Sequence, residues 1–293
     1  MQTENVDKIV QTIEDIPTLP IISRKIHGLL EDDNVSIKKL EQIIQADPPL
    51  AAKIMKTVNS SFYGMLSKVS TIDHAVVILG LDELKNIVLS FSIHDFFKEG
   101  NELIDRRMFW KHSVICSQVA KFLAGYFNIA KNNTFLLSGL IHDIGKIVID
   151  KYFHEDFISI IDYISTKGCT FSKAEKEILG RTHYQIAAKL LQQWQFPPEV
   201  VMQIFYHHAP WHDDNYTTGS TILYLANMLT KIVGYPCFKD EKQAEISDII
   251  NPAMLSYLNK NGFEIDGASF ERLLQRINDH ISNESSNVLS IFE

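Results

Sequence analysis

Apolar residues recur at helical spacing along most of this 293-residue chain, and the alternation that marks a β-strand is confined to short fragments. Residues 105–127 show the helical pattern clearly, with an inward stripe that includes Phe109, His112, Cys116 and Leu123. Tight turns containing proline or glycine separate such segments, because these residues interrupt helices. The sequence therefore predicts an all-α, multi-helical protein.

Several helix ends can be located from their capping residues. Asp47 followed by two prolines is a typical cap and first turn. Ser172, with Glu175 three positions later, has the pattern of a capping box. Further helices are expected near the N-terminus, over residues 1–15, 21–30 and 37–46. The C-terminal part is expected to form two helices and a polar tail, at residues 247–259, 269–282 and 283–288.

Charge and hydropathy exclude several classes of protein. The formal charge is −8 and no basic run offsets it, which argues against a nucleic-acid surface or an anionic-membrane binder. No apolar stretch approaches 18 residues, so no transmembrane helix is expected, and the first residues lack the pattern of a signal peptide. Cys116, Cys169 and Cys237 are odd in number and far apart, which favours a reduced, cytoplasmic location.

The stretch from Leu140 to Lys146 contains the first chemical signal, a histidine and an aspartate side by side between apolar runs. A buried carboxylate is costly unless it is paired or bound to a metal, and imidazole with carboxylate suits a divalent transition metal. The pair His142-Asp143 is a weak signal alone, because a helix end or cap explains it equally well. Lys146 is open to two interpretations, a phosphate-binding point charge or a lysine near a helix C-terminus.

Four further histidines strengthen the metal interpretation, because they fall where they could converge on this pair: His112, His183, His207 and His208. Neighbours on a helix diverge by about 100°, so adjacent residues share a centre only at a junction of helices. A mixed histidine and aspartate set favours Fe, Mn, Zn or Ni over calcium. Each histidine also has a simpler explanation: a core residue at His112, a helix start at His183, or a solvated helix end at His207-His208. The remaining six are interpreted as structural or surface residues, namely His27, His74, His94, His154, His212 and His280.

These residues resemble the signature of a known superfamily. His112 and then His142-Asp143 are similar to the HD superfamily of metal-dependent phosphohydrolases, and the later histidines extend the match toward its HD-GYP branch, which hydrolyses cyclic di-GMP. The N-terminal half resembles the related HDOD family, the output domain of bacterial signalling proteins. Four ordered motifs carry that resemblance over residues 15–215: Ile16-Pro17-Thr18-Leu19-Pro20; Ile44, Asp47, Pro48 and Leu50; Val58-Asn59-Ser60 with Phe62-Tyr63-Gly64; and Ile72, Ala75 and Leu79-Gly80.

The resemblance implies two metal sites. The first would take Asp143, His183, His207 and His208, and the second would take His112, His142 and bridging Asp143. The fourth ligand of the second site would be Asn227, a weak one, because this position is an aspartate in the superfamily. Met108 stands where the HD-GYP branch has a glutamate, and Gly234-Tyr235-Pro236 lies too far downstream to be that branch's triplet.

Two functions follow from the resemblance. Most HDOD domains have lost their metal ligands, which implies a signalling output module that binds a partner protein, here with a retained metal site of one or two ions. The alternative is a metal-dependent phosphohydrolase acting on a nucleotide, possibly cyclic, with Asp143 and Lys146 as the catalytic residues. The polar turn at 99–101 divides the chain into an expected N-terminal HDOD subdomain, residues 1–100, packed on an HD-like helical subdomain, residues 101–293.

Overall fold

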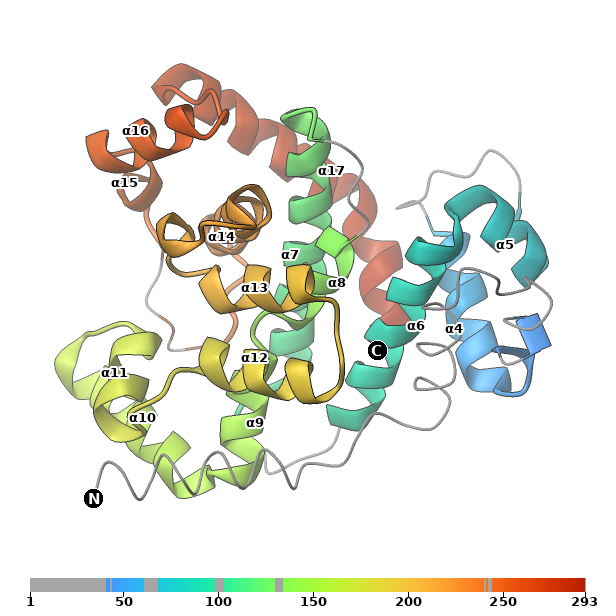
Figure 1. Cartoon of the computed structure of the whole chain (residues 1–293), viewed down its shortest axis with the longest axis horizontal. Helices are drawn as coiled ribbons and strands as arrows, with labels where there is room; N and C mark the ends of the chain where they lie inside the picture. Colours follow the sequence, from blue (N-terminus) through green and yellow to red (C-terminus); the bar gives the residue numbers. More distant parts are fainter. Residues whose placement is uncertain are drawn as a thin grey trace. The chain divides into compact units, whose positions relative to one another are not determined.

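The chain is all-α, as predicted, and its described part contains helices without strands (Figure 1). The computed structural model describes residues 41–42, 44–60, 68–97, 103–129, 134–239, 241 and 244–292, the last ten of them by backbone alone. The predicted helices before residue 41 and the motif Ile16–Pro20 lie outside these residues. None of the described helices is long and apolar enough to cross a membrane.

One compact unit includes residues 41–97, and the helices described in this range are α4 (Pro48–Val58), α5 (Ile72–Leu79) and α6 (Leu81–Phe97). Asp47 caps α4 as predicted, because its side chain accepts a hydrogen bond from the Leu50 N–H. Gly80 separates α5 from α6 with a φ of +82°, a conformation that glycine adopts without strain. Both α4 and α5 pack on α6.

The second unit covers residues 103–278 among those described. Its helices are α7 (Arg106–Tyr126), α8 (Thr134–Ile141), α9 (Ile144–Tyr152), α10 (His154–Lys167), α11 (Phe171–Ile178), α12 (His183–Gln193), α13 (Pro198–Tyr206), the short 3-10 helix η2 (Pro210–His212), α14 (Thr217–Ile232), α15 (Ile246–Ile249), α16 (Pro252–Lys260) and the start of α17 (Gly267–Phe292). Helix α7 packs against α8 and α14, and α12 packs against α9 and α13. In Figure 1 these six helices lie together within this unit.

Three details of the predicted helices are wrong. Helix α11 begins after Thr170, and the Glu175 carboxylate does not complete a capping box with Ser172 but binds His183. The single helix expected over 247–259 is two helices, because Asn251 caps a new helix that has Pro252 in its first turn. The expected polar tail at 283–288 is helical, as part of α17.

The division into subdomains at residue 100 stays a prediction. One change of unit does fall between residues 97 and 103, but the chain after residue 278 is assigned with residues 41–97 rather than with the unit that precedes it.

Candidate metal centre

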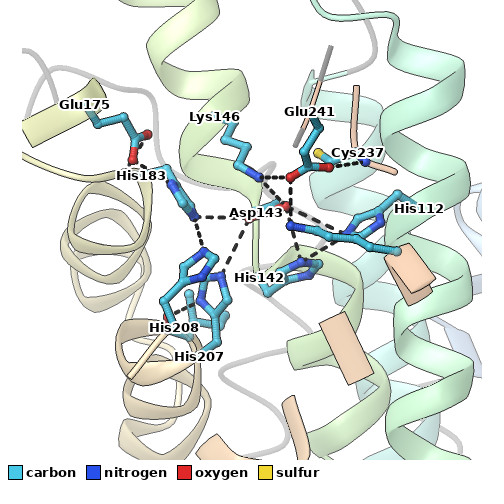
Figure 2. A network of polar contacts seen from close by, with 12 residues as sticks. His112, His142, Asp143, Lys146, Glu175, His183, His207, His208, Cys237 and Glu241 are labelled. Carbon is cyan, nitrogen blue, oxygen red and sulfur yellow. Dashed lines mark hydrogen bonds and ion pairs between the residues drawn. The ribbon is translucent and has the colours of Figure 1, made fainter. Parts of the chain in front are cut away.

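Asp143 lies in the turn between α8 and α9, at the N-cap position of α9. An aspartate at this position usually accepts a hydrogen bond from the first turn of its helix, but the Asp143 side chain makes no capping bond. Its fully buried carboxylate instead faces the histidines, as Figure 2 shows. Because His142 and Asp143 occupy a turn, both side chains reach the same centre, which adjacent residues inside one helix do less readily.

Three histidines face the Oδ1 side of Asp143. His183, the first residue of α12, places Nε2 3.2 Å from Oδ1, and His207, just after α13, places Nε2 3.7 Å from it. His208 places its Nε2 3.1 Å from that of His183. These are the four residues predicted for the first metal, and their candidate ligand atoms all lie within 4.8 Å of one another.

Two histidines face the Oδ2 side. His142 places Nε2 3.3 Å from Oδ2, and His112, from the middle of α7, places Nε2 3.8 Å from it. The structure thus brings together the three residues predicted for the second metal. Figure 2 shows Asp143 between the two groups, which is the position of a bridging carboxylate.

Hydrogen bonds fix which ring nitrogen of these histidines carries a proton. The Nδ1 atoms of His112, His142 and His207 lie 2.7, 2.8 and 2.6 Å from the backbone carbonyls of Tyr235, Gly139 and Ile204. A carbonyl oxygen only accepts, so each Nδ1 donates and each neutral ring presents a lone pair at Nε2. His183 donates from Nδ1 to the Glu175 carboxylate at 2.8 Å. Partners of this kind orient metal-binding histidines.

The resulting lone pairs require a cation. The Nε2 atoms of His112 and His142 lie 3.3 Å apart, and two lone pairs facing each other repel unless a proton or a metal ion lies between them. On the other side, Asp143 Oδ1 and His207 Nε2 are buried and have no hydrogen-bond partner in the part of the chain that the structure describes. Buried polar atoms are seldom left unpaired. The donor set fits a divalent transition metal on each side.

The pKa values of the cluster follow from burial and from Asp143. Burial lowers the pKa of His112 and of His207 to about 3, and that of His208 well below its usual value. Burial would also lower the pKa of His142, but the Asp143 and Cys116 side chains outweigh it and raise that pKa to about 10. His142 therefore holds a proton where a metal would bind. The charges of His142 and Lys146 outweigh burial and keep the pKa of the Asp143 carboxyl well below its usual range.

Lys146 lies in the first turn of α9 and is buried beside the Asp143 carboxylate. Its Nζ donates to Asp143 Oδ2 at 2.7 Å and lies 3.7 Å from Glu241 Oε1. Asp143 and Glu241 outweigh burial and raise the pKa of the Lys146 ammonium. Lys146 is charged, and it shares the oxygen that would bind the second metal.

Two glycines allow the helices to approach closely enough to form this centre. A Cβ atom at Gly145 would lie 2.0 Å from the backbone oxygen of His183, and one at Gly139 would lie 2.5 Å from the Cα of Ser117. Neither backbone could yield without moving its helix. Gly145 thereby sets the spacing of α9 and α12, which carry Asp143 and His183.

Sequence reasoning missed two residues of the site. The sequence assigns Glu175 to a capping box with Ser172. In the structure its carboxylate instead contacts His183, eight residues later and on the next helix. Glu241 had no local signal, because it approaches Lys146 from a segment 95 residues downstream. Asn227, on α14, is buried, and its Oδ1 has no hydrogen-bond partner within the described ranges. Among the other histidines, none of the described ones belongs to the cluster, and His27 lies outside the described residues.

A family model of the HDOD domain matches residues 16–210 of this chain, which is most of its length. The chain belongs to the HDOD family. The family match includes the five histidines and Asp143 but ends before Asn227, Lys231 and Glu241. These last residues are features of the chain beyond the matched HDOD region.

Two curated relatives match parts of this chain. An uncharacterized protein of Treponema pallidum (strain Nichols) is 24% identical over 77% of this chain and 44% of its own, and YuxH of Bacillus subtilis (strain 168) is 24% identical over 47% and 32%. The HDOD chain thus spans less than half the length of these relatives.

Three solved structures share the fold. An HDOD protein of Geobacter sulfurreducens has a TM-score of 0.76 at 21% identity and 98% coverage of both chains. A candidate phosphohydrolase of Shewanella amazonensis SB2B has a TM-score of 0.75 at 21% identity, covering 97% of this chain and 98% of its own. A candidate signal transduction protein of Marinobacter aquaeolei VT8 has 0.73 at 21% identity, covering 99% and 65%.

Proposed function

We propose that this HDOD chain is a bacterial signalling output module that retains a metal centre and acts by binding a partner protein. The observation that supports the metal centre is the carboxylate of Asp143, which presents one oxygen to each of two groups of imidazole nitrogens. Membership of the HDOD family supports the signalling role, as does the fold shared with a protein named for signal transduction. Fe, Mn, Zn and Ni all suit the donor set.

The two sites would hold metal differently. The first ion would bind Asp143, His183, His207 and His208, and the second would bind His112, His142 and Asp143, with Asn227 as a weak fourth ligand. A bound ion of this type lowers the pKa of a coordinated water and can supply a nucleophile near neutral pH. Glu175 and the backbone carbonyls would keep the imidazoles oriented in either case.

A second candidate function is hydrolysis of a phosphate ester of a nucleotide, and Lys146 is the observation that favours it. A charged lysine 2.7 Å from the bridging carboxylate could hold a phosphate as a point charge. In that reaction Asp143 would hold both ions and Lys146 would hold the substrate. Asn227 argues against strong activity, because an amide oxygen holds a second ion less firmly than a carboxylate does.

Metal content per chain tests the proposal, on protein purified without chelator or nickel affinity resin. We expect one or two equivalents of a transition metal in the wild type and almost none in Asp143→Ala, since that change removes a ligand from both sites. Asp162→Ala, an exposed position on α10, is the matched control and should keep the metal. Unchanged metal in Asp143→Ala would contradict the ligand assignment.

The same proteins separate the two functions. The metal-loaded wild type is assayed for hydrolysis of a phosphodiester, while Asp143→Ala is tested for retained partner binding. Turnover that disappears in Asp143→Ala would favour the phosphohydrolase. Absence of turnover, with partner binding kept in a folded Asp143→Ala variant, would favour the output module.

A further inference from the structure

A second cluster of buried charges adjoins the metal centre and consists of two lysines around one carboxylate. Glu241 Oε1 accepts a hydrogen bond from Lys231 Nζ at 2.7 Å and lies 3.7 Å from Lys146 Nζ. All three side chains are at least nine-tenths buried. Figure 2 shows Glu241 directly across from Lys146, on the side of it away from His183.

The two lysines come from different helices and meet at a fixed place. Lys146 is on α9, three residues after the bridging aspartate, and Lys231 is in the last turn of α14. The Phe171 and Phe238 rings lie 5.3 and 5.7 Å from Lys146 Nζ, so the ammonium has little water around it. Glu241 is held from its own segment by the Cys237 N–H, which donates to Oε2 at 2.7 Å.

Charge balance explains why an anion belongs between these lysines. Two ammonium groups in a site that excludes water repel each other strongly and need a negative partner. Asp143 offsets Lys146 in the structure as it stands. Once Asp143 binds metal, its charge is shared with the ion, and the Lys146 ammonium needs another anion nearby. Glu241 already offers one, although its 3.7 Å separation from Lys146 is longer than a good ionic hydrogen bond.

We propose that Lys146 and Lys231 form an anion site for a phosphate group and that Glu241 is a built-in occupant competing with it. The inference rests on the proposed metal centre, because the anion site would bring a phosphate-bearing ligand next to the metal. Glu241, which would control access to this site, lies outside the matched HDOD region. A phosphate would take the place of the carboxylate, with both lysines as donors, and Glu241 would have to withdraw.

The test measures binding of inorganic phosphate and of AMP by calorimetry, to the wild type and to Glu241→Gln. The glutamine keeps an oxygen that can accept from Cys237 N–H but removes the charge. Because a carboxylate within 4 Å of the lysines repels an entering anion, we expect Glu241→Gln to bind phosphate at least about tenfold more tightly. Lys231→Met in the Glu241→Gln background should cancel the gain. Asp95→Asn, in the exposed pair with Lys53, is the control and should change nothing.

The two probes distinguish the source of the phosphate. A larger gain for AMP would identify a nucleotide site, and equal gains would identify a site for free phosphate; both support the inference. An unchanged or weaker affinity in Glu241→Gln would overturn it, as would a gain that survives Lys231→Met. Loss of metal in Glu241→Gln would also overturn it, because Glu241 would then act as a ligand.

Two controls keep the result interpretable. The titrations are made with metal-loaded and with chelator-treated protein. A wild type that holds no metal would contradict the proposed metal centre, but the effect of Glu241 on phosphate binding would still be measurable. Glu241→Asp, which keeps the charge and shortens the side chain, is the second variant in case Glu241→Gln does not fold. Failure of both to fold, even with phosphate present, would show that Glu241 is a structural clip and would overturn the inference.

Discussion

The two sides of Asp143 differ in how completely they are equipped to hold an ion. On the Oδ1 side three imidazoles and the carboxylate form a set of four candidate ligands, and that oxygen has no hydrogen-bond partner among the described residues. On the Oδ2 side two imidazoles share the oxygen with Lys146, and the predicted fourth ligand is Asn227, an amide rather than a carboxylate. We therefore expect the first side to bind an ion more tightly than the second side, where protons, ions or a ligand should exchange more readily.

The largest effect on metal affinity is expected when one imidazole is removed from one side or the other, in two separate variants. His183→Ala should abolish the first ion and keep the second, while His112→Ala should do the reverse. Loss of a ligand should weaken the affected site by more than about a hundredfold, since even the loss of an outer hydrogen bond costs 10- to 100-fold. Competition with a chelator of known affinity measures each site. Equal loss of both ions in both variants would show that the two sides are not separate.

A smaller effect is expected from Glu175, which touches only one side. Glu175→Gln keeps the size of the side chain but weakens the charge-assisted hydrogen bond that orients His183. Affinity at the first site should fall about 10- to 100-fold, and the second site should not change. Glu177→Gln, an exposed carboxylate on the same helix α11, is the matched control and should change neither site. An effect of Glu175→Gln on the second site alone would contradict the assignment.

The effect of pH is expected to be about tenfold per pH unit and to differ between the two sides. With a pKa of about 10, His142 is protonated at neutral pH in the absence of metal, so an ion must displace that proton. Second-site affinity should therefore rise about tenfold per unit as pH increases, and about a hundredfold between pH 6 and 8. His207 and His208 have lowered pKa values and are already unprotonated, so they add no such slope to the first site. Chelator competition at pH 6, 7 and 8 in the two one-sided variants measures both slopes.

The sequence predicted most helices because their signals are local. Asp47 before two prolines and the apolar stripe of 105–127 depend on neighbours within one or two turns. The interruption at Asn251 lies within a continuous apolar pattern, and only the cap followed by proline indicates it. Which segments share a compact unit depends on packing between residues far apart in the sequence, and hydrophobic periodicity does not contain that information.

The site was predictable in part for a different reason. The two histidine groups around Asp143 were assigned through the resemblance to a family, and spacing alone left a cap or a core histidine as alternatives. Glu175 and Glu241 had no such motif. The Glu175 carboxylate reaches His183 across the short turn between α11 and α12, and that of Glu241 reaches Lys146 because the helices α10 to α14 fold back between them. Both contacts depend on how helices pack against each other.

Gly145 has a consequence for how relatives of this chain are compared. Glycine is not a metal ligand, so a comparison of ligands alone would not include it. The absence of a side chain at Gly145 nevertheless allows the His183 backbone to lie against α9. A descendant that kept every histidine and gained one methyl group here would present an intact motif and a displaced centre. A relative can therefore lose its metal through a change at a position that does not contact metal. A search for retained metal sites should compare position 145 together with positions 142 and 143.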